Sequence, residues 1–281
     1  MTVDAPLAPG PARTRRARGG NTLTRSSGLG LGIALTWFSL LVLIPLGLIV
    51  IQSVDGGWAT FRETLTSPQT ASALRLTVEQ ALLVTLVNVV MGTLIAWVLV
   101  RDSFPGQRVL EVVIDIPFAL PTIVAGLVLL SLYGPQGPLG INVANTERSV
   151  FLALLFVTLP FVVRTVQPVL MELDRDVEEA AASLGASRFT TLRRIILPSL
   201  APAITAGAAL SFARGISEYG SLVLLSGNLP NKTEVASVRI LTYIENGNDA
   251  AAASVAVILL AVALLAIIVL QVLSSVVARR G

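Results

Sequence analysis

Three ionisable side chains lie within otherwise apolar stretches of the sequence and are the first candidates for chemistry. Arg214 and Glu218 are four residues apart, and Arg164 lies between Pro160 and Pro168. Charged groups inside a membrane span are costly, so each is a functional candidate by default. Residues four apart share a helix face, so Arg214 and Glu218 can neutralise each other as a structural ion pair. Alternatively, Arg214 or Arg164 helps an anion to cross, or Arg164 simply belongs to the inner half of its helix.

Several other chemistries are excluded by residue type. The chain has no Cys and no His, so it has no disulfide, thiol nucleophile, Cys-based zinc site or Ser-His-Asp triad. Its one lysine, Lys232, is not preceded by Gly. A P-loop needs Gly-Lys-Ser/Thr to hold nucleotide phosphates. We therefore expect neither an ATPase site nor a bound cofactor or metal in this chain.

Composition places these residues in a membrane. The chain has 281 residues, of which 54% are hydrophobic and 13% charged, and its mean hydropathy is +0.79. Soluble domains carry roughly 25% charged residues. Continuous apolar runs long enough to cross a hydrocarbon core of about 30 Å predict an all-α membrane protein. Six spans are expected, at about residues 29–51, 78–100, 112–132, 150–171, 200–225 and 252–277.

The basic residues predict the orientation of these spans. Six crossings put both termini on one side, and thirteen of the basic residues fall on that side against five on the other. The positive-inside rule then makes both termini cytoplasmic. Residues 1–27 are rich in Pro, Gly and Arg and show no apolar period, which predicts a disordered basic cytoplasmic tail.

The loop between the fourth and fifth spans, residues 174–198, is the most informative segment. Asp174 or Asp176 can cap a first short helix, and Gly185 stands where a left-handed C-terminal cap belongs. Ser187 can cap a second helix, and Pro198 fits the first turn of the next span. By composition alone, the loop is equally an amphipathic segment at the membrane interface or a helix that enters a partner's groove.

The spacing within this loop resembles the EAA motif of importer permeases. These are the membrane subunits of binding-protein-dependent ABC transporters with the type I importer fold. The resemblance covers the chain from about residue 73 to its end. The matching positions are Glu179, Ala180, Ala181, Gly185, Ile195, Leu197 and Pro198.

The resemblance assigns this loop a mechanical role. In that family it is a coupling helix that docks into a cleft on a separate cytoplasmic ATPase, which uses ATP and Mg²⁺. Closure of two ATPase subunits then turns the bundle outward-facing as a rigid body. Glu179 is expected to pair with a basic or polar group of the ATPase, and Ala180 and Ala181 to pack in its groove. Gly185 is expected to make the turn, and the Leu197–Pro198 segment to launch the next helix.

Further segments resemble the sulfate/thiosulfate importer permeases, and specifically one of their two unequal membrane subunits. Ser217 departs from that pattern, which usually has Gly there. The resemblance implies a CysW-like second permease, two CysA-like ATPase subunits and an extracytoplasmic sulfate-binding protein. Molybdate and tungstate permeases share part of the pattern and remain an alternative. The matching segments are Asp115–Thr122, Leu159–Pro168, Phe212–Ser221 and Ser226–Glu234.

The expected organisation follows from these observations. Residues 1–27 form the tail, 28–72 the first span and an outer loop, and 73–281 the permease core. The expected location is the bacterial inner membrane, and the binding protein should meet the outer loops near residues 52–77, 133–149 and 226–250. The alternative of another class is a secondary anion carrier that needs no ATP. Such carriers commonly contain inverted repeats, and no clear repeat is seen here.

Overall fold

The computed structural model describes residues 25–278, which are helices joined by turns and loops with no strand among them. The all-α prediction is therefore confirmed for this part of the chain. Residues 1–24 of the predicted tail, and Arg279 and Arg280 of the charge count, lie outside the described residues. Residues 25–27, which we assigned to the tail, instead begin the first helix. The chain divides into two units, residues 1–47 and 48–281.

The helix that begins in the first unit is interrupted by one wide turn, and its last part, from Leu48, belongs to the second unit. Helix α1 (Arg25–Phe38) runs into the π-helical turn η1 (Ser39–Leu43), and α2 (Ile44–Val54) follows. Pro45 lacks an N–H and its ring would meet the carbonyl four residues earlier, so the helix widens just before it. The Ile44 N–H accordingly donates to the Ser39 carbonyl. The stretch Ser27–Val54 is long and apolar enough to cross a membrane, as predicted.

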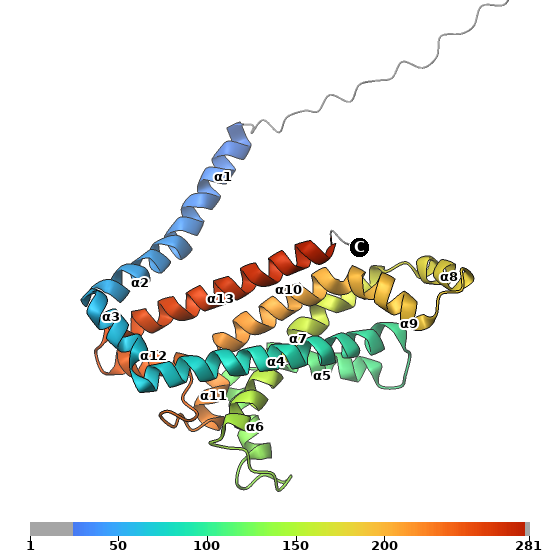
Figure 1. Cartoon of the computed structure of the whole chain (residues 1–281). Helices are drawn as coiled ribbons and strands as arrows, with labels where there is room; N and C mark the ends of the chain where they lie inside the picture. Colours follow the sequence, from blue (N-terminus) through green and yellow to red (C-terminus); the bar gives the residue numbers. More distant parts are fainter. Residues whose placement is uncertain (1–24, 279–281) are drawn as a thin grey trace, which may run out of the picture. The chain divides into compact units, whose positions relative to one another are not determined.

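Three long helices form the centre of the second unit (Figure 1): α4 (Pro68–Arg101), α7 (Glu147–Glu172) and α10 (Leu197–Ile216). Glycine permits their close approach. A Cβ added to Gly92 of α4 would lie 2.8 Å from the Val162 Cβ, and one added to Gly207 of α10 would lie 2.9 Å from the Val162 Cα. Small residues at such contacts let helix backbones pack tightly within a membrane.

The third predicted span is not one helix. It consists of α5 (Gln107–Ala119) and α6 (Thr122–Tyr133), which meet at an angle of 118°. Leu120, which precedes Pro121, is extended with ψ 135°. A residue before proline is driven from the helical region, and proline cannot donate to the preceding turn. The pair is a broken span or a re-entrant segment, which corrects the prediction of a continuous helix over 112–132.

The fifth predicted span ends early. Helix α10 stops at Ile216, and α11 (Gly220–Leu225) is a separate short helix that packs on α6. A Cβ on Gly126 of α6 would lie 2.6 Å from the Ser221 carbonyl, which shows how closely the two backbones approach. The prediction of one helix over 200–225 was therefore wrong beyond Ile216.

The remaining helices lie at the two ends of the second unit or run along it. The long α13 packs on α10 and on α12. These remaining helices are α3 (Gly57–Thr66), α8 (Arg175–Ser183), α9 (Arg188–Thr191), η2 (Leu192–Ile196), α12 (Ala236–Glu245) and α13 (Asp249–Ala278).

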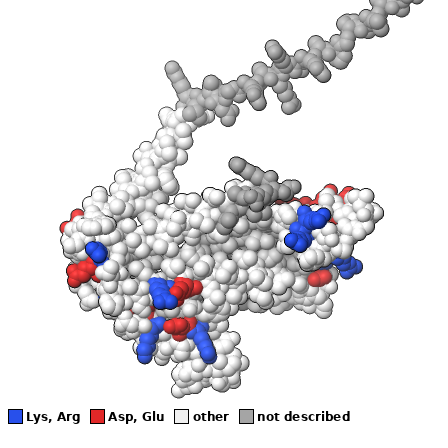
Figure 2. All heavy atoms as spheres, viewed as in Figure 1, with Lys and Arg blue, Asp and Glu red and all other residues white. Residues whose placement is uncertain are grey.

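The surface agrees with membrane insertion. In the view of Figure 2, charged side chains of this unit gather near α3, α11 and α12 and, at the other end, near α8 and α9, with an uncharged band between. Five described helices are long and apolar enough to cross a membrane, or six if the bent α5–α6 pair counts as one span.

Candidate functional site

Helix α8 is defined by a cap at each end, as the sequence predicts. The Asp174 side chain accepts a hydrogen bond from the Asp176 N–H at 3.0 Å. Gly185 has φ +85°, the left-handed conformation that favours glycine. The Gly185 and Ala186 N–H groups donate to the Ala182 and Ala181 carbonyls at 2.9 and 3.0 Å. These two bonds form a Schellman motif, which ends the helix and turns the chain towards α9.

The exposed side of α8 carries a glutamate and small side chains. Glu179 and Ala180 are exposed and Ala181 is half-buried. The Glu179 carboxylate has no partner among the side chains that the structure describes. Leu184, just after the helix end, and Phe189 of α9 are strongly exposed, and the sequence interpretation missed both. An unpaired carboxylate beside small and apolar side chains is the surface that a docking helix offers.

The second half of the loop leads into the membrane without a break. Ser187 caps α9 by accepting from the Thr190 N–H at 3.2 Å, as predicted. Helix α10 begins at Leu197 with Pro198 in its first turn, but η2 runs directly into it. The Leu197 N–H donates to the Leu192 carbonyl across this wide turn. Ile195 and Pro198 are half-buried and Leu197 is exposed, whereas Ile196 between them is the core residue.

The inner face of α8 makes an ion pair that the sequence did not indicate. Glu178, the neighbour of Glu179, contacts Arg101 at the end of α4 through its Oε1 and the arginine Nη2. The Arg101 guanidinium also lies over the Trp97 ring, 5.5 Å from its centre. The two adjacent glutamates thus differ in environment, Glu178 half-buried and Glu179 exposed, because successive helical positions are rotated by about 100°.

Arg164 is paired rather than free. Its Nε and Nη2 bind Oδ1 and Oδ2 of Asp115 on α5 at 2.7 and 2.5 Å. Its Nη1 donates to Gln167 at 2.7 Å and its Nη2 to the Glu111 carbonyl at 3.1 Å. The side chains of Arg164 and Asp115 are 31% and 47% exposed on this subunit. This bidentate pair supports the structural alternative, while its exposure leaves it accessible from one face.

Arg214 and Glu218 form the ion pair that their spacing predicts. Arg214 Nη2 lies 2.6 Å from Glu218 Oε2, a contact without standard hydrogen-bond geometry. The Glu218 Oε1 accepts from the Ser221 N–H and hydroxyl, both at 2.9 Å. However, Glu218 lies past the end of α10, so the pair closes a turn and does not share the face of a continuous helix. The Glu218 side chain is fully buried and that of Arg214 is 29% exposed.

A polar contact joins the three central helices at a point that the sequence analysis overlooked. Asn88 of α4 donates through Nδ2 to the Thr158 hydroxyl of α7 at 2.7 Å and to the Ser211 hydroxyl of α10 at 3.1 Å. Its Oδ1 is buried with no partner. The available signal was an asparagine in the middle of an apolar run, which is unusual enough in a span to indicate interhelical bonding.

A polar cluster ties α12 to the start of α4. The Arg239 guanidinium lies 4.2 Å from the Tyr243 ring centre and donates to the Tyr243 hydroxyl at 3.0 Å. Thr70 shares a hydrogen bond of 2.8 Å with the same hydroxyl. Burial acts to raise the Tyr243 pKa, but hydrogen bonds with Thr70, Arg239 and Ser67 and the charge of Arg239 bring this pKa below its ordinary value. This cluster lies within two of the predicted outer loops.

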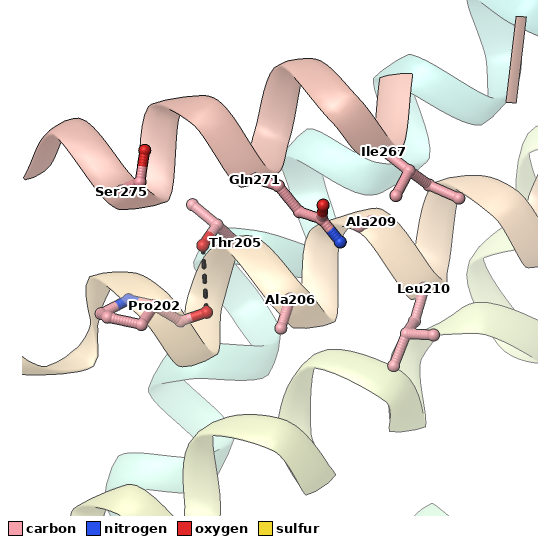
Figure 3. Close-up of a pocket in the computed structure, with 8 residues that line it drawn as sticks. All are labelled: Pro202, Thr205, Ala206, Ala209, Leu210, Ile267, Gln271 and Ser275. Atoms are coloured by element: carbon pink, nitrogen blue, oxygen red, sulfur yellow. Dashed lines mark hydrogen bonds between the residues drawn. The ribbon is translucent and has the colours of Figure 1, made fainter. Parts of the chain in front are cut away.

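An apolar hollow beside α10 is lined by none of the predicted site residues. A cavity of about 410 Å³ lies between α10 and α13 (Figure 3), and Gln271 reaches into it from α13. Thr205 donates to the Pro202 carbonyl at its rim at 3.0 Å. No group of three or more acidic, His or Cys side chains comes together within residues 25–278 to hold a metal ion.

The predicted residues therefore lie at three separate places. The EAA-like positions share the segment from α8 to the start of α10. Arg164 joins α7 to α5, and Arg214 joins α10 to the following turn. Among the described residues, Arg164 and Arg214 share no hydrogen-bond or ion-pair partner.

Comparison with known proteins identifies the family. The Binding-protein-dependent transport system inner membrane component family matches residues 88–280. The chain is 41% identical over 259 residues to the sulfate transport system permease protein CysT of Escherichia coli (strain K12), covering 90% of this chain and 94% of that protein. It is 42% identical over 248 residues to the CysT protein of Synechocystis sp., covering 86% and 87%.

A solved structure shows the same fold at low sequence identity. A chain of the bacterial alginate ABC transporter, in complex with alginate pentasaccharide-bound periplasmic protein, matches with a TM-score of 0.72 and 16% identity. The match covers 89% of this chain and 94% of that chain. This chain thus belongs to the family of binding-protein-dependent transport system inner membrane components and has the type I ABC importer permease fold.

Proposed function

We propose that this chain is the permease subunit of an ATP-driven sulfate importer, in which it forms half of the translocation pathway. The relatives that it matches at 41% and 42% identity, over most of both lengths, are named as sulfate transport permeases. Thiosulfate is the second anion of the proposed system. The chain itself contributes no ATPase site, and the partner ATPase binds Mg²⁺ and hydrolyses ATP.

The observation that carries the coupling role is the exposed face of α8. Glu179 has no partner among the described side chains, Ala180 is exposed, and the Gly185 turn holds the helix at the end of the bundle. Glu179 pairs with a basic or polar group of a CysA-like ATPase, and Ala180 and Ala181 pack in a groove of that ATPase. The segment containing Ile195, Leu197 and Pro198 carries the movement into α10 because it forms one helical stretch with that helix.

The Arg164–Asp115 pair supports a pathway along α5 and α7. Both side chains are partly exposed on this subunit, yet Arg164 lies in the candidate span Glu147–Glu172 and Asp115 in the bent α5–α6 pair. Charged groups at this depth face a bundle interior or a water-filled cavity, because lipid cannot solvate them. This face therefore meets a second, CysW-like permease or the pathway between the two subunits. Arg164 supplies charge along this face, and Arg214 with Glu218 is a separate candidate for the pathway.

The proposed orientation has both termini in the cytoplasm. Arg101, Arg188, Arg193 and Arg194 lie at the α8 end, where the ATPase docks. The extracytoplasmic sulfate-binding protein meets the opposite end, which includes α3, α12 and the Arg239–Tyr243 cluster. Domain bounds of 28–72 and 73–281 remain our proposal.

Two other functions lead to different experimental results. A molybdate or tungstate importer would keep the same fold and coupling helix and change only the anion. A secondary anion carrier would transport without ATP, and it would have no use for the exposed Glu179 of α8.

The experiment is uptake of radiolabelled sulfate into proteoliposomes that contain this chain, the second permease, the ATPase and the binding protein. Molybdate and thiosulfate are added as competitors. We expect ATP-dependent uptake that is lost when this chain is omitted and that resists molybdate. ATP-dependent molybdate uptake without sulfate uptake would show that sulfate is not the substrate. Gradient-driven uptake without the ATPase would show that the chain is not part of an ATP-driven importer.

A further inference from the structure

Helix α8 has few attachments to the membrane helices. The chain joins it to α7 through Leu173 and Asp174, and to α9 through residues 184–187. Among the described helices, α9 is its main packing neighbour, and even that contact is small. Among the side chains that the structure describes, the Arg101–Glu178 ion pair is the one polar bond between α8 and a membrane helix.

This ion pair is well shielded and fixed from several sides. The side chains of Arg101 and Glu178 are only 12% and 25% exposed. The Trp97 ring lies under the guanidinium, and Trp97 and Glu178 both line a hollow of about 500 Å³ beneath α8 and α9. A partly desolvated charge pair is less screened by water and salt than a surface pair. It can therefore hold the orientation of a short helix.

The pair ends on one of the three central helices of the bundle. Arg101 is the last residue of α4, which packs along α7 and α10. Asn88 and the Gly92–Val162 contact join these three helices. A force applied to α8 reaches α7 and α10 through the chain, and among the described side chains the polar bond that carries it to the end of α4 is that of Glu178.

We propose that Arg101 and Glu178 are positioning residues for ATPase coupling, which rests on the proposed function above. Their pair fixes α8 on the bundle, so that movement of the docked ATPase is transmitted to α4 together with α7 and α10. Without the pair, α8 turns on its two connections and absorbs that movement. Glu179 binds the ATPase, and Glu178 ensures that movement of the bound ATPase reaches α4.

The test compares Glu178→Gln and Arg101→Gln with wild type in the complete transporter, with three measurements. These are co-purification of the ATPase, thermal unfolding of the chain, and ATP hydrolysed per sulfate imported. Both variants should keep the ATPase, while ATP used per sulfate rises about fivefold or more, the lower end of common coupling effects. The exchange R101E/E178R should restore the ratio to within about twofold of wild type, because it rebuilds a salt bridge.

Two controls separate the readouts. Glu172→Gln removes an exposed glutamate at the end of α7 and should leave all three measurements unchanged. Since the chain has no cysteine, Ser183→Cys provides a unique site for a nitroxide on α8. The spin label should become more mobile in Glu178→Gln and Arg101→Gln and return to wild-type mobility in the exchange variant.

The possible failures are distinguishable. An unchanged ATP-to-sulfate ratio in both single variants, with normal wild-type uptake, would overturn the inference and leave the proposed function standing. Loss of ATPase co-purification in Glu178→Gln would also overturn it, because Glu178 would then be part of the docking surface. A wild-type transporter without ATP-dependent uptake would overturn the proposed function and the inference together.

Discussion

Arg164 of α7 holds Asp115 of α5 through two parallel contacts of 2.7 and 2.5 Å, although 49 residues separate them in the sequence. The pair links the first half of a broken span to a continuous one. The two carboxylate oxygens of Asp115 accept hydrogen bonds that the Arg164 guanidinium could otherwise donate to an oxyanion. A guanidinium group binds carboxylates and tetrahedral anions with similar geometry. Asp115 thus binds the guanidinium group that we propose meets the anion.

The two members of this pair should differ in their effect on transport. Arg164→Gln removes the positive charge, so we expect sulfate uptake to fall about tenfold or more, the size of one charged hydrogen bond. Asp115→Asn keeps that charge, and Gln167 and the Glu111 carbonyl still hold Arg164. It should therefore retain most of the uptake. Initial rates in proteoliposomes with equal amounts of transporter provide the measurement. Equal losses in both variants would show that the pair is only structural.

Removal of Arg214 should destabilise the chain because it strands a buried carboxylate. The Glu218 side chain is fully buried, so Arg214→Gln should cost about 2–4 kcal/mol in stability. The double variant R214Q/E218Q should recover most of this loss. Thermal unfolding in mild detergent measures both. If Arg214→Gln kept wild-type stability and lost uptake, Arg214 would act on the anion and not on the fold.

Gly185 should be required for its backbone conformation. Its φ is +85° and an added Cβ would meet no atom within 4 Å, so a substitution strains the turn without a clash. Gly185→Ala should cost about 1–2 kcal/mol locally and weaken ATPase co-purification. Gly185→Asn should be milder because asparagine adopts the left-handed region more readily. Stronger loss with Asn than with Ala would mean that the ATPase groove, and not the turn, excludes a side chain.

Gly126 should be required for packing. A Cβ there would lie 2.6 Å from the Ser221 carbonyl, which is backbone and cannot move aside without shifting α11. Gly126→Ala should therefore lower stability by about 1–3 kcal/mol, as overpacked cores do. Gly47→Ala is the matched control, because a Cβ at Gly47 meets nothing within 4 Å of the chain. A wild-type unfolding temperature for Gly126→Ala would contradict the close approach of α6 and α11.

Local features were predictable because they depend on neighbouring residues. The Asp174 and Ser187 caps and the left-handed Gly185 each follow from side chains within a few positions. Hydropathy likewise located the spans, since burial in lipid demands long apolar runs. Because hydropathy is averaged over such runs, it did not reveal that the helices break at Pro121 and after Ile216.

Long-range partners could not be predicted. Asp115, Arg101 and Asn88 find their partners on helices 49, 77 and 70 residues away, and no pattern of spacing encodes those contacts. The Arg214–Glu218 pair was predictable only because four residues separate its members. Even there, the structure places Glu218 in a turn beyond the helix end.

Glu179→Arg tests most directly whether α8 couples this permease to a separate ATPase. ATP-dependent sulfate uptake and ATPase co-purification are measured for this variant and wild type, with membrane insertion checked in both. We predict that the variant inserts normally but loses the ATPase and the uptake. Normal uptake by Glu179→Arg would contradict the coupling role of this helix.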